Sequence, residues 1–307
     1  MLSRTAADLF WLSRYLERAE NTARMLDVAH SMAMMPAGRS AEQELTAPLR
    51  VTGTLAAFRD QHARLNVAAL YQYLAWDSSH PASIFSCLRV ARENAHAVRG
   101  RITTEMWETL NATWLELNRM RSGRHPALKP FCDWVKERSH LWRGATVGTL
   151  ARGDAFHFLR LGTFLERADN SARMLEVKQL DAAEEGSTLR DYYHWSALLQ
   201  ALGALESHQD AFLGRIDADT VAELLILRSD TPRSLRSCLE EINNTLAHIE
   251  GPQGRRAKGI ARTLLAQLEF GSLAELRTAG LGQFLAHFLG TIDRIGSGIR
   301  EEYLESA

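Results

Sequence analysis

Two segments of the sequence place the same charged and amide side chains at helical spacing. Residues 16–28 read LERAENTARMLDV and residues 165–177 read LERADNSARMLEV, with ten of the thirteen positions identical. On an α-helix, residues three and four positions apart share a face, so the Glu, the Asn and the last Arg of each segment fall opposite its apolar positions. A guanidinium can bind a carboxylate through two hydrogen bonds, while carboxylate and amide oxygens accept from an amine. The candidate ligand-binding residues are therefore Glu17, Arg18, Asn21, Arg24, Glu166, Arg167, Asn170 and Arg173.

The repeated polar face allows three interpretations. A solvated face would be free to diverge after a duplication, whereas Glu, Arg, Asn and Arg recur in both segments. The face is therefore either a buried network of ion pairs, because a buried charge must be paired, or a surface that binds a ligand. A third interpretation is catalytic, with Glu17 or Glu166 as the general base on an amine nucleophile. For a network or a shared site, we expect the two helices to lie close together, with Glu17 near Arg173 or Glu166 near Arg24.

A second set of candidate binding residues lies on the helix expected over residues 83–99. Arg92 and Glu93 of this helix align with Asn243 and Asn244 in the second half of the chain. Such asymmetry is expected if only one half kept a role in binding a carboxylate or another anion. The alternative is a surface arginine cluster paired with nearby acidic residues.

Metal and cofactor sites are not predicted. Two Glu-x-x-His sequences, Glu93 to His96 and Glu137 to His140, have the spacing used by di-iron helical bundles. Two such matches arise easily by chance in a chain with 37 acidic residues and 11 histidines. The sequence also has no Walker A sequence and no dinucleotide-binding glycine pattern, so ATP chemistry would have to come from another chain.

The elements that position these residues are helices. Residues 81–88 and 232–239 form a second matching pair, with five of eight positions identical, and repetition at a fixed offset indicates duplicated structural units. We therefore expect an all-α, duplicated helical bundle with two pseudo-symmetric halves of about six helices each, residues 1–153 and 154–307, packed as one compact unit. The expected helices cover residues 3–34, 42–58, 65–76, 83–99, 104–121, 127–149, 154–180, 189–208, 218–228, 233–249, 256–269 and 281–304.

Both copies of the second matching segment begin with Pro-x-Ser and contain a cysteine. A serine at a helix start caps the free backbone N–H groups of the first turn, and a free cysteine often serves as a small buried residue. We expect this role for Cys87 and Cys238. A nucleophilic role is disfavoured because no adjacent histidine recurs in both copies.

Composition excludes several classes of protein. The 307 residues include 36 basic and 37 acidic side chains, for a formal net charge of −1, so the net basic footprint of a nucleic-acid-binding protein is absent. No apolar run approaches the ~20 residues of a membrane span. The N-terminal segment carries Asp8, Glu17 and Glu20, which does not fit a secretory signal. We expect a cytoplasmic protein with neither nucleic-acid nor membrane partners.

The two Glu-Arg segments resemble the alpha-E family of bacterial proteins, and further segments agree: Ser3-Arg-Thr-Ala6, Pro81-Ala-Ser-Ile84 and Phe158-Leu-Arg-Leu-Gly162. The resemblance covers nearly the whole chain. It implies association with circularly permuted ATP-grasp amide ligases, and often with transglutaminase-like proteins. On this basis we expect a partner or substrate-presenting component that does not bind ATP and holds a peptide or amino-acid-like ligand at the Glu-Arg helices. The alternatives are an enzyme acting on a peptide or amide, and a purely structural adaptor.

Overall fold

The structure is all-helical. This computed structural model describes residues 1–35, 41–182, 188–249 and 254–305, and within these ranges the side chains of residues 180–190 are not described. The described residues form α-helices, π-helices and a 3₁₀-helix, with no β-strand among them. The predicted all-α class is confirmed. Within the described ranges, no helix is both long enough and apolar enough to cross a lipid bilayer.

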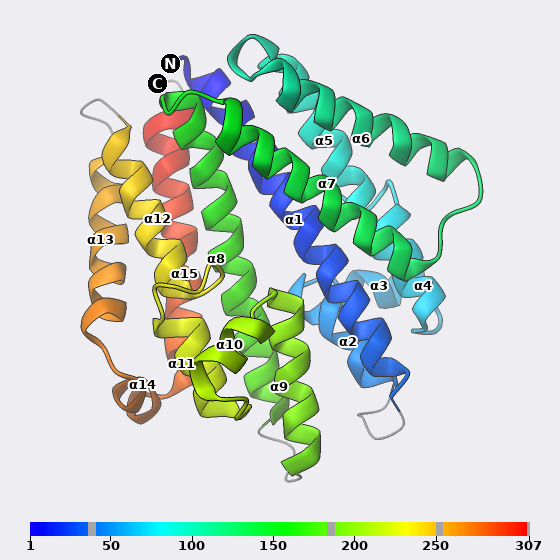
Figure 1. Cartoon of the computed structure of the whole chain (residues 1–307), viewed down its shortest axis with the longest axis vertical. Helices are drawn as coiled ribbons and strands as arrows, with labels where there is room; N and C mark the ends of the chain where they lie inside the picture. Colours follow the sequence, from blue (N-terminus) through cyan, green and yellow to red (C-terminus); the bar gives the residue numbers. More distant parts are fainter. Residues whose placement is uncertain (36–40, 183–187, 250–253, 306–307) are drawn as a thin grey trace.

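The helices follow one another with short connections (Figure 1). Those that precede residue 153 are α1 (Ser3–Ala33), α2 (Ala41–Val51), α3 (Leu55–Gln61), α4 (Val67–Tyr71), the π-helix η1 (Gln72–Trp76), α5 (Ile84–Ala97), the 3₁₀-helix η2 (Arg99–Arg101), α6 (Thr104–Ser122) and α7 (Leu128–Thr149). Those that follow it are α8 (Asp154–Ala182), α9 (Thr188–Leu202), α10 (Leu205–Phe212), α11 (Ala218–Leu227), α12 (Leu235–His248), α13 (Arg255–Phe270), α14 (Leu273–Ala279), α15 (Leu281–Ile299) and the π-helix η3 (Arg300–Leu304).

Two of the predicted helices are each broken by a glycine. The segment expected as one helix over residues 42–58 ends at α2 and restarts at α3, because Gly53 has φ +67° and the N–H of Thr54 donates to Leu49 O at 2.8 Å. Gly203, with φ +60°, separates α9 from α10 in the same way. Glycine adopts this left-handed conformation without a steric penalty, which makes it a common helix terminator. The short helix α14 was also not predicted.

The centre of the molecule is the contact between α1 and α8. These two long helices pack against each other, with α5 and α7 beside α1 and with α12 and α15 beside α8 (Figure 1). The C-terminal helix η3 returns to contact α1. Because α1 has neighbours on several sides, its polar positions are buried together with its apolar ones, as expected of a helix in the interior of a protein. The buried residues include Leu12, Leu16, Ala19, Ala23 and Leu26 on the apolar arc and Glu17, Glu20 and Asn21 on the opposite side.

A glycine permits the close approach of α8 to α1. A Cβ atom at Gly162 would overlap the Phe10 carbonyl oxygen and the Ser13 hydroxyl of α1. Any larger residue at this position would force the two helices apart. The contact between the helices that carry the repeated segments is therefore fixed by backbone proximity as well as by side chains.

The predicted Pro-x-Ser caps are present in both copies. Ser83 Oγ accepts from the N–H of Ser86 at 3.2 Å, and Ser234 Oγ accepts from the N–H of Ser237 at 3.0 Å. Cys87 and Cys238 behind them are both fully buried. The same local geometry thus recurs at matching positions of the sequence. The division of the chain into two repeats at residue 153 stays a prediction.

Candidate functional site

The Glu-Arg pairs of α1 and α8 bind each other crosswise. Arg167 donates from Nε and Nη2 to the two carboxylate oxygens of Glu17, at 2.9 and 3.1 Å. Arg18 donates from Nε and Nη2 to the two carboxylate oxygens of Glu166, at 2.5 and 2.9 Å. Each guanidinium therefore makes the two-point contact that is the strongest form of this ion pair. The carboxylate of each segment is bound by the arginine of the other.

This arrangement confirms one part of the sequence-based expectation and corrects another. The two helices do lie side by side. The expected pairs Glu17–Arg173 and Glu166–Arg24 are wrong, because the arginine adjacent to each glutamate crosses to the opposite helix instead. Arg24 and Arg173 pair within their own helices, with Glu20 and Asp169 at positions i−4.

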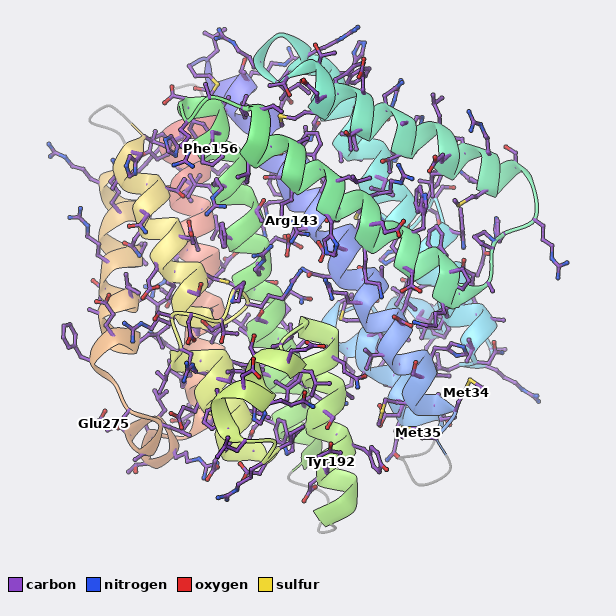
Figure 2. The ribbon with its side chains drawn as sticks, in the orientation of Figure 1. Met34, Met35, Arg143, Phe156, Tyr192 and Glu275 are labelled. Carbon is purple, nitrogen blue, oxygen red and sulfur yellow. The ribbon has the colours of Figure 1, made fainter. Side chains whose placement is uncertain are left out.

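Glu20 is the most heavily contacted carboxylate of the site. Its side chain is fully buried on α1. Arg24 Nε and Arg233 Nη2 each donate to its Oε1 at 2.9 Å, and Ser139 Oγ donates to its Oε2 at 2.6 Å. Arg143 of α7, labelled in Figure 2, donates to the same Oε2. Glu20 thereby joins α1 to α7 and to the segment before α12.

Arg233 connects this cluster to the first crossed pair. Its side chain is buried, and its Nη1 lies 2.8 Å from Asn21 Oδ1 and 3.0 Å from Glu17 Oε1. One guanidinium thus serves three acceptors of α1, namely Glu17, Glu20 and Asn21. The contact with Asn21 fixes the orientation of the amide, whose buried Nδ2 has no hydrogen-bond partner among the described residues.

The electrostatics of the buried carboxylates follow from these contacts. Burial alone would raise the pKa of Glu17, but Arg167 and Arg233 more than offset this and hold the pKa below its ordinary value. Burial would also raise the pKa of Glu20, but the charges of Arg233, Arg143 and Arg24 outweigh it and lower the pKa. Glu166 also has a lowered pKa, because Arg14 and Arg18 outweigh its burial. All three carboxylates are therefore ionised at neutral pH and neutralised by arginines.

A pocket of about 290 Å³ opens beside the second Glu-Arg segment. Arg173 at its wall is 46% exposed, and its Nε donates to Asp169 Oδ2 at 2.8 Å. Arg18, another lining residue, has a side chain that is 31% exposed. The pocket thus presents partly exposed arginine side chains and acidic or amide oxygens within one space. Its polar lining consists of Arg18, Asn21, Thr22, Thr52, Glu166, Asp169, Asn170 and Arg173.

The repeated motif therefore separates into two groups. Five of its eight predicted binding residues line the pocket, whereas Glu17, Arg24 and Arg167 belong to the buried network. From the sequence, the repeated polar face could be either a structural network or a ligand-binding surface. In the structure the two are adjacent, and they share Arg18, Asn21 and Glu166.

The other predicted site residues lie elsewhere. Arg92 donates from Nε to Asn111 Oδ1 at 3.1 Å and lies over the ring of Trp107 on α6. Glu93 is exposed and pairs at 3.8 Å with Arg89 of its own helix. Their recorded partners thus come from α5 and α6, and not from the motif helices.

The two matched cysteines have unreactive thiols. Burial raises the pKa of both Cys87 and Cys238 to about 12, so their thiols are protonated at neutral pH and poor nucleophiles. Among the described residues, no group of three or more His, Cys, Asp or Glu side chains is placed to hold a metal ion. His140 lies 3.8 Å from Glu20 Oε1.

Five members of the network are not among the predicted site residues, namely Arg14, Glu20, Ser139, Arg143 and Arg233. Ser139 and Arg143 of α7 carry no motif, so only tertiary structure brings them to Glu20. Arg233 did have a signal, because it differs from Ala82 at the second position of the matched Pro-x-Ser segments. Arg233 contacts Glu17, Glu20 and Asn21, whereas Ala82 lines the pocket.

Comparison with known proteins agrees with the Glu-Arg pattern. The family model Alpha-E, described as a predicted alpha-helical domain with a conserved ER motif, matches residues 1–304. Uncharacterized proteins of Mycobacterium tuberculosis (strain H37Rv) and Mycobacterium bovis are 26% identical over 318 residues, which cover 94% of this chain. The chain spans 35% of the length of these relatives. No solved structure matches it significantly.

Proposed function

The chain belongs to the Alpha-E family, and on this premise we propose that it is the ligand-binding, non-ATP-binding component of an amide-ligase system. The ligand is a small molecule that carries both an amine and a carboxylate, such as an amino acid or the end of a peptide. It binds in the pocket beside α8 and is presented there to a partner enzyme.

The observation that carries this proposal is the mixed polarity of the pocket. Arg18 and Arg173 have partly exposed side chains, whose guanidinium groups suit a carboxylate. Asp169 and Asn170, which also line the pocket, have oxygens that suit an amine. A volume of about 290 Å³ falls at the lower end of small-molecule sites, which begin near ~300 Å³. Such a space fits one or two residues of a peptide.

The alternative of a general base at Glu17 or Glu166 finds little support. A general base works best with a pKa near the working pH, whereas the arginines lower the pKa of both carboxylates. Both are also buried and bound at two points. These groups suit a structural and positioning role better than proton transfer.

The partner in this proposal is a circularly permuted ATP-grasp ligase, with a transglutaminase-like protein as a second component. This part rests on the family resemblance. Amide formation needs an activated carboxylate, and no ATP-binding pattern was found in the sequence. The partner would use ATP to activate the carboxylate that enters the amide bond. This chain would hold the ligand in position for that reaction.

Binding is tested by titration calorimetry with the dipeptide alanyl-alanine and with its amidated form. We expect the free dipeptide to bind and the amide, which lacks the carboxylate, to bind at least roughly tenfold more weakly, as expected for loss of a charge-assisted contact. Arg173→Ala should abolish this preference. Arg236→Ala is the matched control, because Arg236 pairs with Glu240 at i+4, as Arg173 does with Asp169 at i−4, but on α12.

The partner is tested first by whether the genes beside this one encode a circularly permuted ATP-grasp protein, and then by mixing such a protein with this chain. Co-elution in size-exclusion chromatography, together with faster ATP turnover on adding this chain and the dipeptide, would support the proposal. ATP or dipeptide turnover by this chain alone, lost in Glu17→Gln, would favour the enzyme interpretation instead.

A further inference from the structure

The two matched Pro-x-Ser segments differ at one residue that decides what fills the adjacent space. Arg233 follows Pro232 and sends its guanidinium to three acceptors of α1. At the matching position after Pro81 stands Ala82, whose side chain ends at Cβ. The serine caps that follow both positions have the same geometry.

The pocket lies beside Ala82, the position that matches Arg233. Ala82 is one of its lining residues. Glu166, Asp169 and Asn170, also in the lining, match by sequence the Glu17, Glu20 and Asn21 that surround Arg233. The lining next to Ala82 therefore repeats the set of acceptors that holds a guanidinium in the other half of the chain.

Two of these acceptors each have one side-chain oxygen that accepts no hydrogen bond from the described residues. Asn170 is only 8% exposed, and among the described residues its Oδ1 accepts no hydrogen bond, whereas Asn21 Oδ1 accepts from Arg233. Asp169 uses Oδ2 for Arg173, and its Oδ1 accepts no hydrogen bond within the described part of the chain. Both side chains line the pocket, and neither of the two free oxygens is fully buried, so a donor in the pocket can reach both.

The third acceptor is already occupied. Glu166 receives a second guanidinium from Arg14, whose Nε lies 2.9 Å from Oε2. The matching residue in α8 is Thr163, which explains why Glu17 takes its second guanidinium from Arg233 instead. An incoming cation would therefore bind to Asp169 and Asn170, with Glu166 behind them.

We infer that the pocket beside Ala82 binds a ligand with a guanidinium group, such as free arginine or an arginine residue at the end of a peptide. Asp169 and Asn170 accept from the guanidinium, in the place that Arg233 fills in the other half. Arg173 and Arg18 remain for the ligand's carboxylate. This inference rests on the proposed function. It narrows the proposed ligand from any molecule with an amine and a carboxylate to one that also carries a guanidinium group.

The test compares L-arginine with L-citrulline by titration calorimetry on the full chain. Citrulline has nearly the same shape, but its ureido group carries no charge and fewer donors, so it should bind at least roughly tenfold more weakly, as expected for loss of charge-assisted hydrogen bonds. Ala82→Arg should abolish arginine binding, because its own guanidinium would fill the pocket. Ala82→Ser, which leaves the space open, should retain it.

A second variant keeps the inference testable if Ala82→Arg does not fold. Asp169→Asn should reduce the preference for arginine over citrulline, because an amide at this position carries no charge to bind the guanidinium. Equal affinity for arginine and citrulline would overturn the guanidinium assignment and leave the proposed function standing. If neither these amino acids nor the dipeptide binds, the proposed function itself fails.

Discussion

At the residue scale, the decisive feature is that three ionised carboxylates are buried. Glu17 and Glu166 lie in the contact of α1 with α8, and Glu20 lies between α1, α7 and the segment before α12. The repeated sequence predicted the part of Glu17, Arg18, Glu166 and Arg167, because the Glu-Arg pair recurs in both segments, but it did not single out Glu20 or Arg233. It could not predict which arginine meets which glutamate. Arg18 and Arg167 lie between the polar and apolar faces of their helices, and that position faces the partner helix only once the two helices are packed.

Acid should unfold the protein through these carboxylates. The lowered pKa of Glu20 in the folded state means that the unfolded chain binds more protons at low pH. Stability is therefore fully present above the unfolded pKa of Glu, ~4.5, and is lost progressively as the pH falls below it.

Melting temperatures measured between about pH 7 and 3 should show this loss. Glu20→Gln should lower the melting temperature at pH 7 and flatten its dependence on pH. Glu240→Gln, which breaks the partly exposed pair with Arg236, is the control and should keep the wild-type dependence. An equal acid response in Glu20→Gln and wild type would contradict the account.

At the element scale, the long helices could be predicted from apolar periodicity, but their breaks could not. Gly53 and Gly203 end helices through a left-handed conformation, and nothing in the flanking periodicity distinguishes them from glycines inside a helix such as Gly144. The role of Gly162 is of the same kind, because its need for a hydrogen side chain appears only when α1 lies against α8.

Gly162→Ala should destabilise the protein by about 1–3 kcal/mol, as expected of overpacking in a tight contact. Gly144→Ala on α7 is the matched control, since a Cβ there meets nothing within 4 Å. This control should instead stabilise the protein by about 0.5–1 kcal/mol through helix propensity. Urea unfolding of both variants provides the measurement, and equal effects would show that the approach of α8 to α1 is not restrictive.

At the scale of the whole molecule, the crossed pairs join the first part of the chain to the second. Glu17–Arg167 and Arg18–Glu166 each link residues about 150 positions apart, and α1 also contacts η3 near the other end of the chain. We therefore expect calorimetry to show one unfolding transition, with equal calorimetric and van't Hoff enthalpies. Two separated transitions would indicate that residues 1–153 and 154–307 fold as independent units.

The central claim is that the repeated motif supplies a buried network and a binding pocket side by side. Unfolding free energy and dipeptide affinity, measured in parallel on Arg167→Ala and Arg173→Ala, test it most directly. Arg167→Ala leaves Glu17 with one partner fewer in the core and should cost about 3–5 kcal/mol. Arg173→Ala removes a partly exposed side chain, so it should cost the fold within about 0.5 kcal/mol while abolishing the preference for a free carboxylate. The claim is contradicted if both variants keep wild-type stability and full binding, or if Arg173→Ala unfolds the protein as Arg167→Ala does.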